Sequence, residues 1–166
     1  MTRVSAKNAT RFEIGVTATA GRVYAPALRR RLQAACGLAP LAARGPRDIS
    51  LALVGNARMA ALHEQFLGIP GPTDVLTFEL DHDARGRVTG GEIVVCVPHA
   101  IRTARRLGHR PADELLLYAI HGLLHLCGYD DRTDVDFRRM HRLEDRILTQ
   151  LGIGAVFARG AGDAPA

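Results

Sequence analysis

Apolar and polar residues alternate with a period of two, or form short apolar runs, in four segments of the chain. Residues 11–19, RFEIGVTAT, alternate, and residues 48–55, DISLALVG, form a run of strand length. Residues 74–79 follow a loop with two prolines and a glycine, and residues 92–97, the most apolar run, follow a polar hairpin-like connection. Such patterns are typical of half-buried or fully buried strands. The pattern therefore predicts four β-strands.

Apolar residues at helical spacing occupy the rest of the chain. The expected helices cover residues 24–36, 57–68, 98–107, 111–127 and 133–151. Pro98 and Pro111 stand at first helical positions, and Asn56 and Thr133 are expected as N-caps. In the last helix the expected buried face consists of Phe137, Met140, Leu143, Ile147 and Leu151. Its acidic residues, including Glu144, are expected on a solvated outer face.

Four strands and about five helices, with no internal repeat or linker, predict a single α+β domain with a four-stranded mixed sheet. A chain of 166 residues, 47% of them hydrophobic, is long enough to bury one core. We assign residues 1–151 to this domain. Residues 152–166 are rich in Gly and Ala, and we expect them to form a flexible C-terminal tail.

The formal net charge is +5, and arginine supplies nearly all of the positive charge because Lys7 is the only lysine. A basic surface favours phosphate-bearing partners such as nucleic acid, although arginine bias also follows genome composition. Cys36, Cys96 and Cys127 form no CxxC pair, which indicates reduced thiols and a cytoplasmic protein. No apolar run suits a signal peptide or a membrane-spanning helix, so we expect no membrane association.

Residues 121–131, HGLLHLCGYDD, carry the strongest candidate chemistry. Residues four apart on a helix lie about 40° apart around the axis and roughly 6 Å apart along it, so His121 and His125 can direct their imidazoles at one point. Zinc-binding helices use this spacing. Gly128 is placed to end the helix and to turn Asp130 and Asp131 back toward the histidines. The alternative is a buried helix whose two histidines are ordinary core residues.

The sequence around these histidines resembles the YbeY family of bacterial endoribonucleases, whose signature has the form HGxLHLxGYDH. Residues 121–131 match every fixed position of that signature except the last. Residues 71–78, GPTDVLTF, and residues 90–100, GGEIVVCVPHA, are similar to two further family segments in the same order. The resemblance spans roughly residues 49–150. It implies a zincin-like metal helix.

Carried over position by position, the resemblance makes His121, His125 and Asp131 the ligands of one divalent ion. The family has a third histidine where this chain has Asp131, and a carboxylate oxygen is also a competent zinc ligand. Asp130 remains an alternative third ligand. We therefore expect zinc, while a carboxylate also makes manganese or magnesium possible. No protein general base is evident, so the catalytic residue is left unassigned and a water activated by the ion is expected to attack.

Three positions differ from the pattern of another class of metal-dependent hydrolases or from that of the YbeY family. Gly122 occupies the place of the catalytic glutamate in HExxH proteases, which argues against peptide hydrolysis by that route. Leu67 stands where the YbeY family often has an arginine, and Glu92 stands where aspartate is usual. If the family arginine steadies a phosphate, another residue has to serve here.

Arg102, Arg105 and Arg106 share one helical face just upstream of the histidine helix, and this stripe is the candidate RNA-binding surface. The alternative is a solvated face, which is also the preferred interpretation of Arg29, Arg30 and Arg31. Aromatic residues make up 5% of the chain and tryptophan is absent, so backbone recognition is favoured over base stacking.

The resemblance implies a single-strand-specific, metal-dependent endoribonuclease that acts in rRNA maturation, including 16S rRNA 3′ end processing, and in ribosome quality control. The implied partners are rRNA, small-subunit ribosomal proteins and a GTPase. Asp131 and Leu67 motivate a first rival, a ribosome-associated binding factor with a structural metal and little catalysis. A second rival is a metal-dependent hydrolase of another bond.

Overall fold

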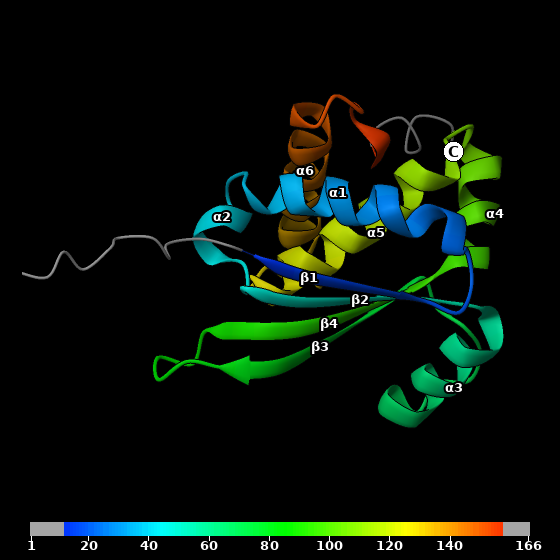
Figure 1. Cartoon of the computed structure of the whole chain (residues 1–166), viewed down its shortest axis with the longest axis horizontal. Coiled ribbons are helices and arrows are strands. Elements are labelled where there is room, and N and C mark those ends of the chain that lie inside the picture. Colours follow the sequence, from blue (N-terminus) through cyan, green and yellow to red (C-terminus); the bar gives the residue numbers. More distant parts are fainter. Residues whose placement is uncertain (1–11, 158–166) are drawn as a thin grey trace, which may run out of the picture.

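The computed structural model describes residues 12–157 and has an α+β architecture built on one mixed sheet (Figure 1). The strands lie in the order β1–β2–β4–β3. β1 (Glu13–Ala18), β2 (Asp48–Val54) and β4 (Val88–Cys96) run parallel to one another, and β3 (Val75–His82) is antiparallel to β4. The four predicted strands are confirmed. β3 and β4 extend beyond their predicted bounds because they pair with each other into the polar hairpin.

Six α-helices and one 3-10 turn accompany the sheet within residues 12–157. They are η1 (Arg22–Tyr24), α1 (Ala25–Cys36), α2 (Leu41–Arg44), α3 (Asn56–Leu67), α4 (Val97–Leu107), α5 (Pro111–Leu126) and α6 (Asp134–Gln150). Only α2 has no counterpart among the predicted helices, because four residues are too few to show a helical period. None of the described helices combines the length and the apolar composition needed to cross a membrane.

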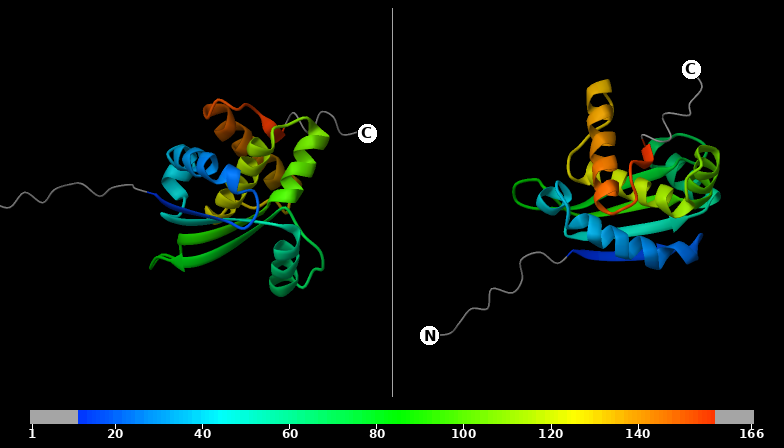
Figure 2. Two further views of the ribbon diagram at one scale, coloured as in Figure 1. Left: turned by 45° about the vertical axis from the view of Figure 1, so that its right-hand side comes forward. Right: turned by 90° about the horizontal axis from the view of Figure 1, so that it is seen from above.

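The helices cover the two faces of the sheet unequally. α1, α5 and α6 lie over one face, and α3 lies over the other (Figure 1, Figure 2). β4 contributes to both cores, because Ile93 and Val95 belong to the large cluster and Val94 and Cys96 to the small cluster under α3. Burial on both faces explains why this segment is the most apolar strand of the sequence.

Two glycines let α5 approach the sheet closely. A Cβ atom on Gly122 of α5 would lie 2.7 Å from Cγ2 of Ile93 and 3.1 Å from Oγ1 of Thr77. A Cβ atom on Gly91 of β4 would lie 2.6 Å from Cδ1 of Leu126. Because both positions lack a side chain, the C-terminal half of α5 packs directly across β3 and β4.

Two predictions about the C-terminal part of the chain are wrong in detail. Phe137 is 42% exposed rather than part of the buried face of α6, although Met140 and Ile147 are fully buried. Val156 has no exposed surface, and the backbone N–H of Phe157 donates to Oδ1 of Asp145 at 3.0 Å. Residues up to 157 therefore pack on the domain, contrary to a flexible tail that begins at residue 152. The rest of the expected tail, residues 158–166, lies outside the described residues.

Candidate metal centre

His121 and His125 lie one turn apart on α5, and their side chains meet. Their Nε2 atoms are 3.1 Å apart, and the two rings are nearly perpendicular, with centroids 4.6 Å apart. Both side chains reach the surface only partly, with 18% and 30% of their area exposed. The convergence of the two imidazoles that the i, i+4 spacing predicts is therefore present.

The turn at Gly128 brings the third group to the histidines. Gly128 has a φ of 90°, which a residue with a side chain rarely adopts. Its N–H donates to the carbonyl of His125 at 2.9 Å, and the N–H of Tyr129 donates to the carbonyl of Leu124 at 3.0 Å. These two bonds form a Schellman motif, which reverses the chain after the helix. Asp131 then places Oδ2 3.5 Å from Nε2 of His121 and Oδ1 3.9 Å from Nε2 of His125.

The carboxylate of Asp130 accepts hydrogen bonds from its neighbours in the turn rather than facing the histidines. Its Oδ2 accepts from Nε of Arg132 at 2.5 Å, and its Oδ1 accepts from the N–H of Asp131 at 2.8 Å. The Arg132 hydrogen bond is the largest cause that lowers the pKa of this exposed carboxyl group below its usual value. Of the two neighbouring aspartates, Asp131 is the one whose carboxylate faces the histidines.

The other ring nitrogen of each histidine is held by a protein acceptor. Nδ1 of His121 lies 2.6 Å from Oε1 of Glu144, and Nδ1 of His125 lies 3.1 Å from the carbonyl oxygen of Tyr129. Since a carboxylate and a carbonyl can only accept, each Nδ1 carries the proton of the neutral ring. The lone pairs of both Nε2 atoms therefore converge, together with the carboxylate of Asp131. Either a metal ion between these atoms or a proton on one Nε2 satisfies such an arrangement.

These three groups fit a divalent ion. Zinc bonds to nitrogen and oxygen are about 2.0–2.2 Å long, so ligand atoms of a tetrahedral site lie about 3.3–3.6 Å apart. The observed separations of 3.1, 3.5 and 3.9 Å lie around that value. The fourth direction faces a cavity, so a bound ion would keep an open position. A second group of candidate ligand atoms, from His121, His141 and Glu144, lies directly behind the first.

Glu144 is the residue of this site that the sequence interpretation misplaced. It has no exposed surface and accepts hydrogen bonds from His121 and from Nδ1 of His141. The signal was present, because Glu144 falls four residues after Met140 and three before Ile147, on the apolar stripe of α6. Burial disfavours its charge, yet the two histidine hydrogen bonds keep the pKa of Glu144 below its usual value.

The two histidines have opposite protonation tendencies. Burial opposes a positive charge on His121, but the hydrogen bond and the negative charge of Glu144 outweigh it and raise the pKa of His121. Burial, followed by the positive charge of His121, lowers the pKa of His125. The His125 imidazole is therefore neutral at neutral pH. A metal ion bound at Nε2 of His121 would compete with a proton, so metal binding there would strengthen as the pH rises.

A cavity of about 620 Å³, which we call the metal cavity, opens in front of these candidate ligands, between β3 and the turn after α5. Its lining includes four carboxylate residues, Asp74, Glu79, Asp130 and Asp131, and a single arginine, Arg132. Leu67 lines the same cavity and is 58% exposed, so no guanidinium occupies the position of the family arginine. Glu92 lines a different cavity, on the side of the sheet that α3 covers.

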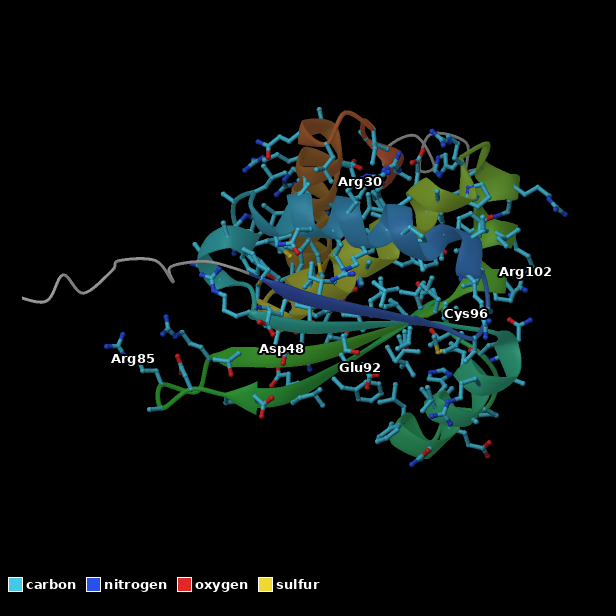
Figure 3. All side chains as sticks on the ribbon, in the orientation of Figure 1. Arg30, Asp48, Arg85, Glu92, Cys96 and Arg102 are labelled. Carbon is cyan, nitrogen blue, oxygen red and sulfur yellow. The ribbon has the colours of Figure 1, made fainter. Side chains whose placement is uncertain are left out.

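The predicted arginine stripe lies apart from the candidate ligands. Arg102, Arg105 and Arg106 are exposed on α4, and none of them lines the metal cavity. Figure 3 shows Arg102 at the α4 end of the molecule, whereas Arg85 lies at the opposite end, at the tip of the β3–β4 hairpin. Regular spacing correctly placed the three side chains on one face, but it carried no information about where that face points.

Comparison with known proteins agrees with this geometry. The sequence profile described as Endoribonuclease YbeY matches residues 22–152. The chain belongs to the YbeY family of endoribonucleases. The matched region contains every residue of the candidate metal centre.

Curated members of the family show the extent of the similarity. Endoribonuclease YbeY of Micrococcus luteus is 38% identical over 110 residues, which cover 63% of this chain and 70% of the relative. Endoribonuclease YbeY of Moorella thermoacetica is 37% identical over 135 residues, which cover 76% and 85%. A solution structure of a Thermotoga maritima protein has a TM-score of 0.56 and 27% identity, over 86% of this chain and 92% of that one. The fold and the family assignment therefore agree.

Proposed function

We propose that this YbeY-family chain is a cytoplasmic, single-strand-specific endoribonuclease whose single divalent ion is held by His121, His125 and Asp131. The observation that carries the proposal is the convergence of two Nε2 lone pairs and one carboxylate, since both Nδ1 atoms are already committed to Glu144 and Tyr129. Three protein ligands leave one tetrahedral position open, as in catalytic zinc sites. Zinc is the metal we favour, and Asp131 also suits manganese or magnesium.

The residues around the ion hold its histidine ligands in position rather than transfer protons. A bound divalent ion would supply Lewis-acid stabilisation for the negative charge that develops on the phosphate. Glu144 and the Tyr129 carbonyl fix the tautomer and the ring orientation of the two histidines. Gly122 offers no side chain to act as a base, and the close packing on Ile93 excludes one. We place the single RNA strand in the cavity in front of these residues, beside β3.

The substrate we propose is rRNA, including the 3′ end of 16S rRNA, in maturation and ribosome quality control. Small-subunit ribosomal proteins and a GTPase are the proposed partners, by analogy with the family that the sequence resembles. The α4 arginines Arg102, Arg105 and Arg106 remain a predicted contact for RNA that extends beyond the cavity.

The test compares cleavage of a single-stranded RNA that spans the 16S 3′ end with cleavage of its duplex. We expect the single strand to be cut, the chelated protein to be inactive, and activity to return with zinc or manganese. His125→Ala removes a partly exposed ligand and should abolish cleavage, whereas His63→Ala, a histidine outside the cavity lining, should leave it unchanged. Cleavage that survives in His125→Ala would point to a contaminating nuclease and contradict the proposal.

Asp131 and Leu67 favour one second candidate, a ribosome-associated binding factor whose metal is structural. This alternative predicts that His125→Ala lowers thermal stability while the wild-type protein cuts no RNA at any metal concentration. Binding to small ribosomal subunits without cleavage would support it. Cleavage and binding assays on the wild-type protein alone therefore distinguish the two candidate functions.

A further inference from the structure

A second hollow adjoins the metal cavity on the other side of the Gly128 turn. Its volume is about 680 Å³, and it shares Glu79, Leu126 and Gly128 with the metal cavity. The other lining residues come from α2 and the α2–β2 connection, from the β3–β4 hairpin and from Cys127 after α5. The charged ones among them are Arg44, Arg47, Asp83 and Arg87. We call this hollow the arginine groove. The shared residues make the two hollows one continuous depression along β3.

Two of its three arginines form no ion pair with a carboxylate among the described residues. Arg87 is paired with Asp83, with Nη2 2.8 Å from Oδ2. Arg44 and Arg47 are exposed and have no ion-pair partner between residues 12 and 157. Unpaired arginines whose forks can hold phosphate oxygens are the usual means by which proteins grip a nucleic-acid backbone.

Both unpaired arginines are held in place by other contacts. The guanidinium of Arg47 lies over the ring of Phe12, 4.5 Å from its centroid, and donates to the carbonyl of Ala42 at 3.3 Å. The guanidinium of Arg44 lies 5.7 Å from the ring centroid of Tyr129, a residue that also lines the metal cavity. Their side chains are thus partly ordered before any ligand binds, which lowers the entropy lost on binding.

The charge of the metal cavity makes a separate anchor necessary. Four carboxylate residues line that cavity, and its only arginine, Arg132, is already paired with Asp130. Such a surface suits a cation, and Asp74 and Glu79, which lie outside the proposed ligand set, repel the phosphates on either side of the bond to be cut. Among the arginines that line the two hollows, the ones without an ion pair to a described carboxylate are Arg44 and Arg47 of the arginine groove.

We propose that the arginine groove, through Arg44 and Arg47, binds the backbone of a single RNA strand next to the bond that is cut. This inference rests on the proposed function, because it assigns a subsite to the same substrate. The strand lies along β3, with one part over His121, His125 and Asp131 and the adjoining part over the Gly128 turn. Contact with the backbone rather than the bases agrees with the lack of free aromatic rings among the groove lining.

The experiment measures binding of a fluorescein-labelled, 12-nucleotide single-stranded RNA by anisotropy, in EDTA so that no cleavage occurs. The variants are Arg44→Ala/Arg47→Ala in the groove, Arg105→Ala/Arg106→Ala on α4, and Arg29→Ala/Arg30→Ala on α1, each of which removes two exposed charges. We expect the groove variant to bind about tenfold more weakly than either of the others at equal salt. The slope of log affinity against log salt should fall by about 1.4, since each phosphate contact to single strands contributes about 0.7.

Arg44→Ala alone keeps the contact of Arg47 with Phe12 and should still lose several-fold in affinity, which guards against misfolding of the double variant. Equal RNA affinity of the groove and α1 variants would overturn the inference. A loss of affinity confined to the α4 variant would also overturn it and would show that α4 binds the RNA backbone. Metal-dependent cleavage by the wild-type protein is measured in parallel. Absence of metal-dependent cleavage would contradict the proposed function. Unchanged RNA binding by the groove variant would contradict this inference alone.

Discussion

Nδ1 of His121 lies 2.6 Å from Oε1 of Glu144, and Glu144 is fully buried. Glu144 lies on α6 and His121 lies on α5. This hydrogen bond therefore connects the helix that carries the two candidate histidine ligands to the helix that orients one of them. The same carboxylate accepts from Nδ1 of His141, whose ring stacks on that of Phe157 at 3.5 Å between centroids. Phe157, His141, Glu144 and His121 thus form one continuous chain of contacts that ends at the candidate metal centre.

Glu144→Gln should weaken metal binding about 10–100-fold, the range seen when outer partners of metal-bound histidines are changed. A glutamine oxygen still accepts from His121, but it supplies no negative charge to raise the basicity of the ring. Competition with a chromophoric chelator measures the change. Glu64→Gln, an exposed position on α3, is the matched control and should not alter the affinity. Unchanged metal affinity in Glu144→Gln would contradict the positioning role.

Gly122→Ala should lower the free energy of unfolding by about 1–2 kcal/mol. The new methyl group would press on Cγ2 of Ile93, a β-branched side chain with little freedom to move, and overpacking of this kind costs about 1–3 kcal/mol. The higher helix propensity of alanine returns part of that cost. Urea denaturation followed by circular dichroism measures the difference. Gly15→Ala, whose Cβ meets nothing within 4 Å, is the control, and equal stability of the two variants would contradict the close approach of α5.

Local patterns predicted the parts of the site that lie within a few residues of one another. The spacing of His121 and His125, the stop at Gly128 and the return of Asp131 all follow from helix geometry and from one left-handed residue. Glu144 was misassigned because periodicity shows which face of α6 a residue occupies, but not that this face meets His121. Burial of a carboxylate depends on a partner from another helix, and that partner is set by tertiary packing.

Sequence patterns also failed to show which arginines lie near the metal cavity. Arg102, Arg105 and Arg106 form an obvious stripe in the sequence, yet α4 carries them away from the metal cavity. Arg44 and Arg47 form no motif. The sheet order and the short helix α2, which no pattern predicted, bring them to the C-terminal end of α5.

Val156→Ala should destabilise the domain by about 1–3 kcal/mol, because it removes buried methyl groups and leaves a cavity. Val156 is fully buried, although it follows a stretch of glycine and alanine. Thermal unfolding monitored by circular dichroism provides the measurement. Val23→Ala, at a position that is 82% exposed, makes the same chemical change and should have little effect. A destabilisation no larger than that of Val23→Ala would show that the segment after α6 does not anchor to the core.

The thiol of Cys36 should stay unreactive toward alkylating reagents at pH 8 in the folded protein. Burial raises the pKa of Cys36 to about 12, so the thiolate fraction at pH 8 is about 10⁻⁴, compared with about a quarter for a free cysteine. Burial raises the pKa of Cys127 to about 12 as well. Iodoacetamide labelling followed by peptide mass spectrometry measures the rate at each cysteine. Urea-unfolded protein is the control, and rapid modification of Cys36 in the folded protein would contradict its burial.

The position of the metal ion tests the account most directly. Crystals of protein loaded with one equivalent of zinc, measured on both sides of the zinc absorption edge, give an anomalous difference map. We expect a single peak about 2.0–2.2 Å from Nε2 of His121, Nε2 of His125 and one carboxylate oxygen of Asp131. A peak between His141 and Glu144, or no ordered peak beside His121, would contradict the proposed metal centre.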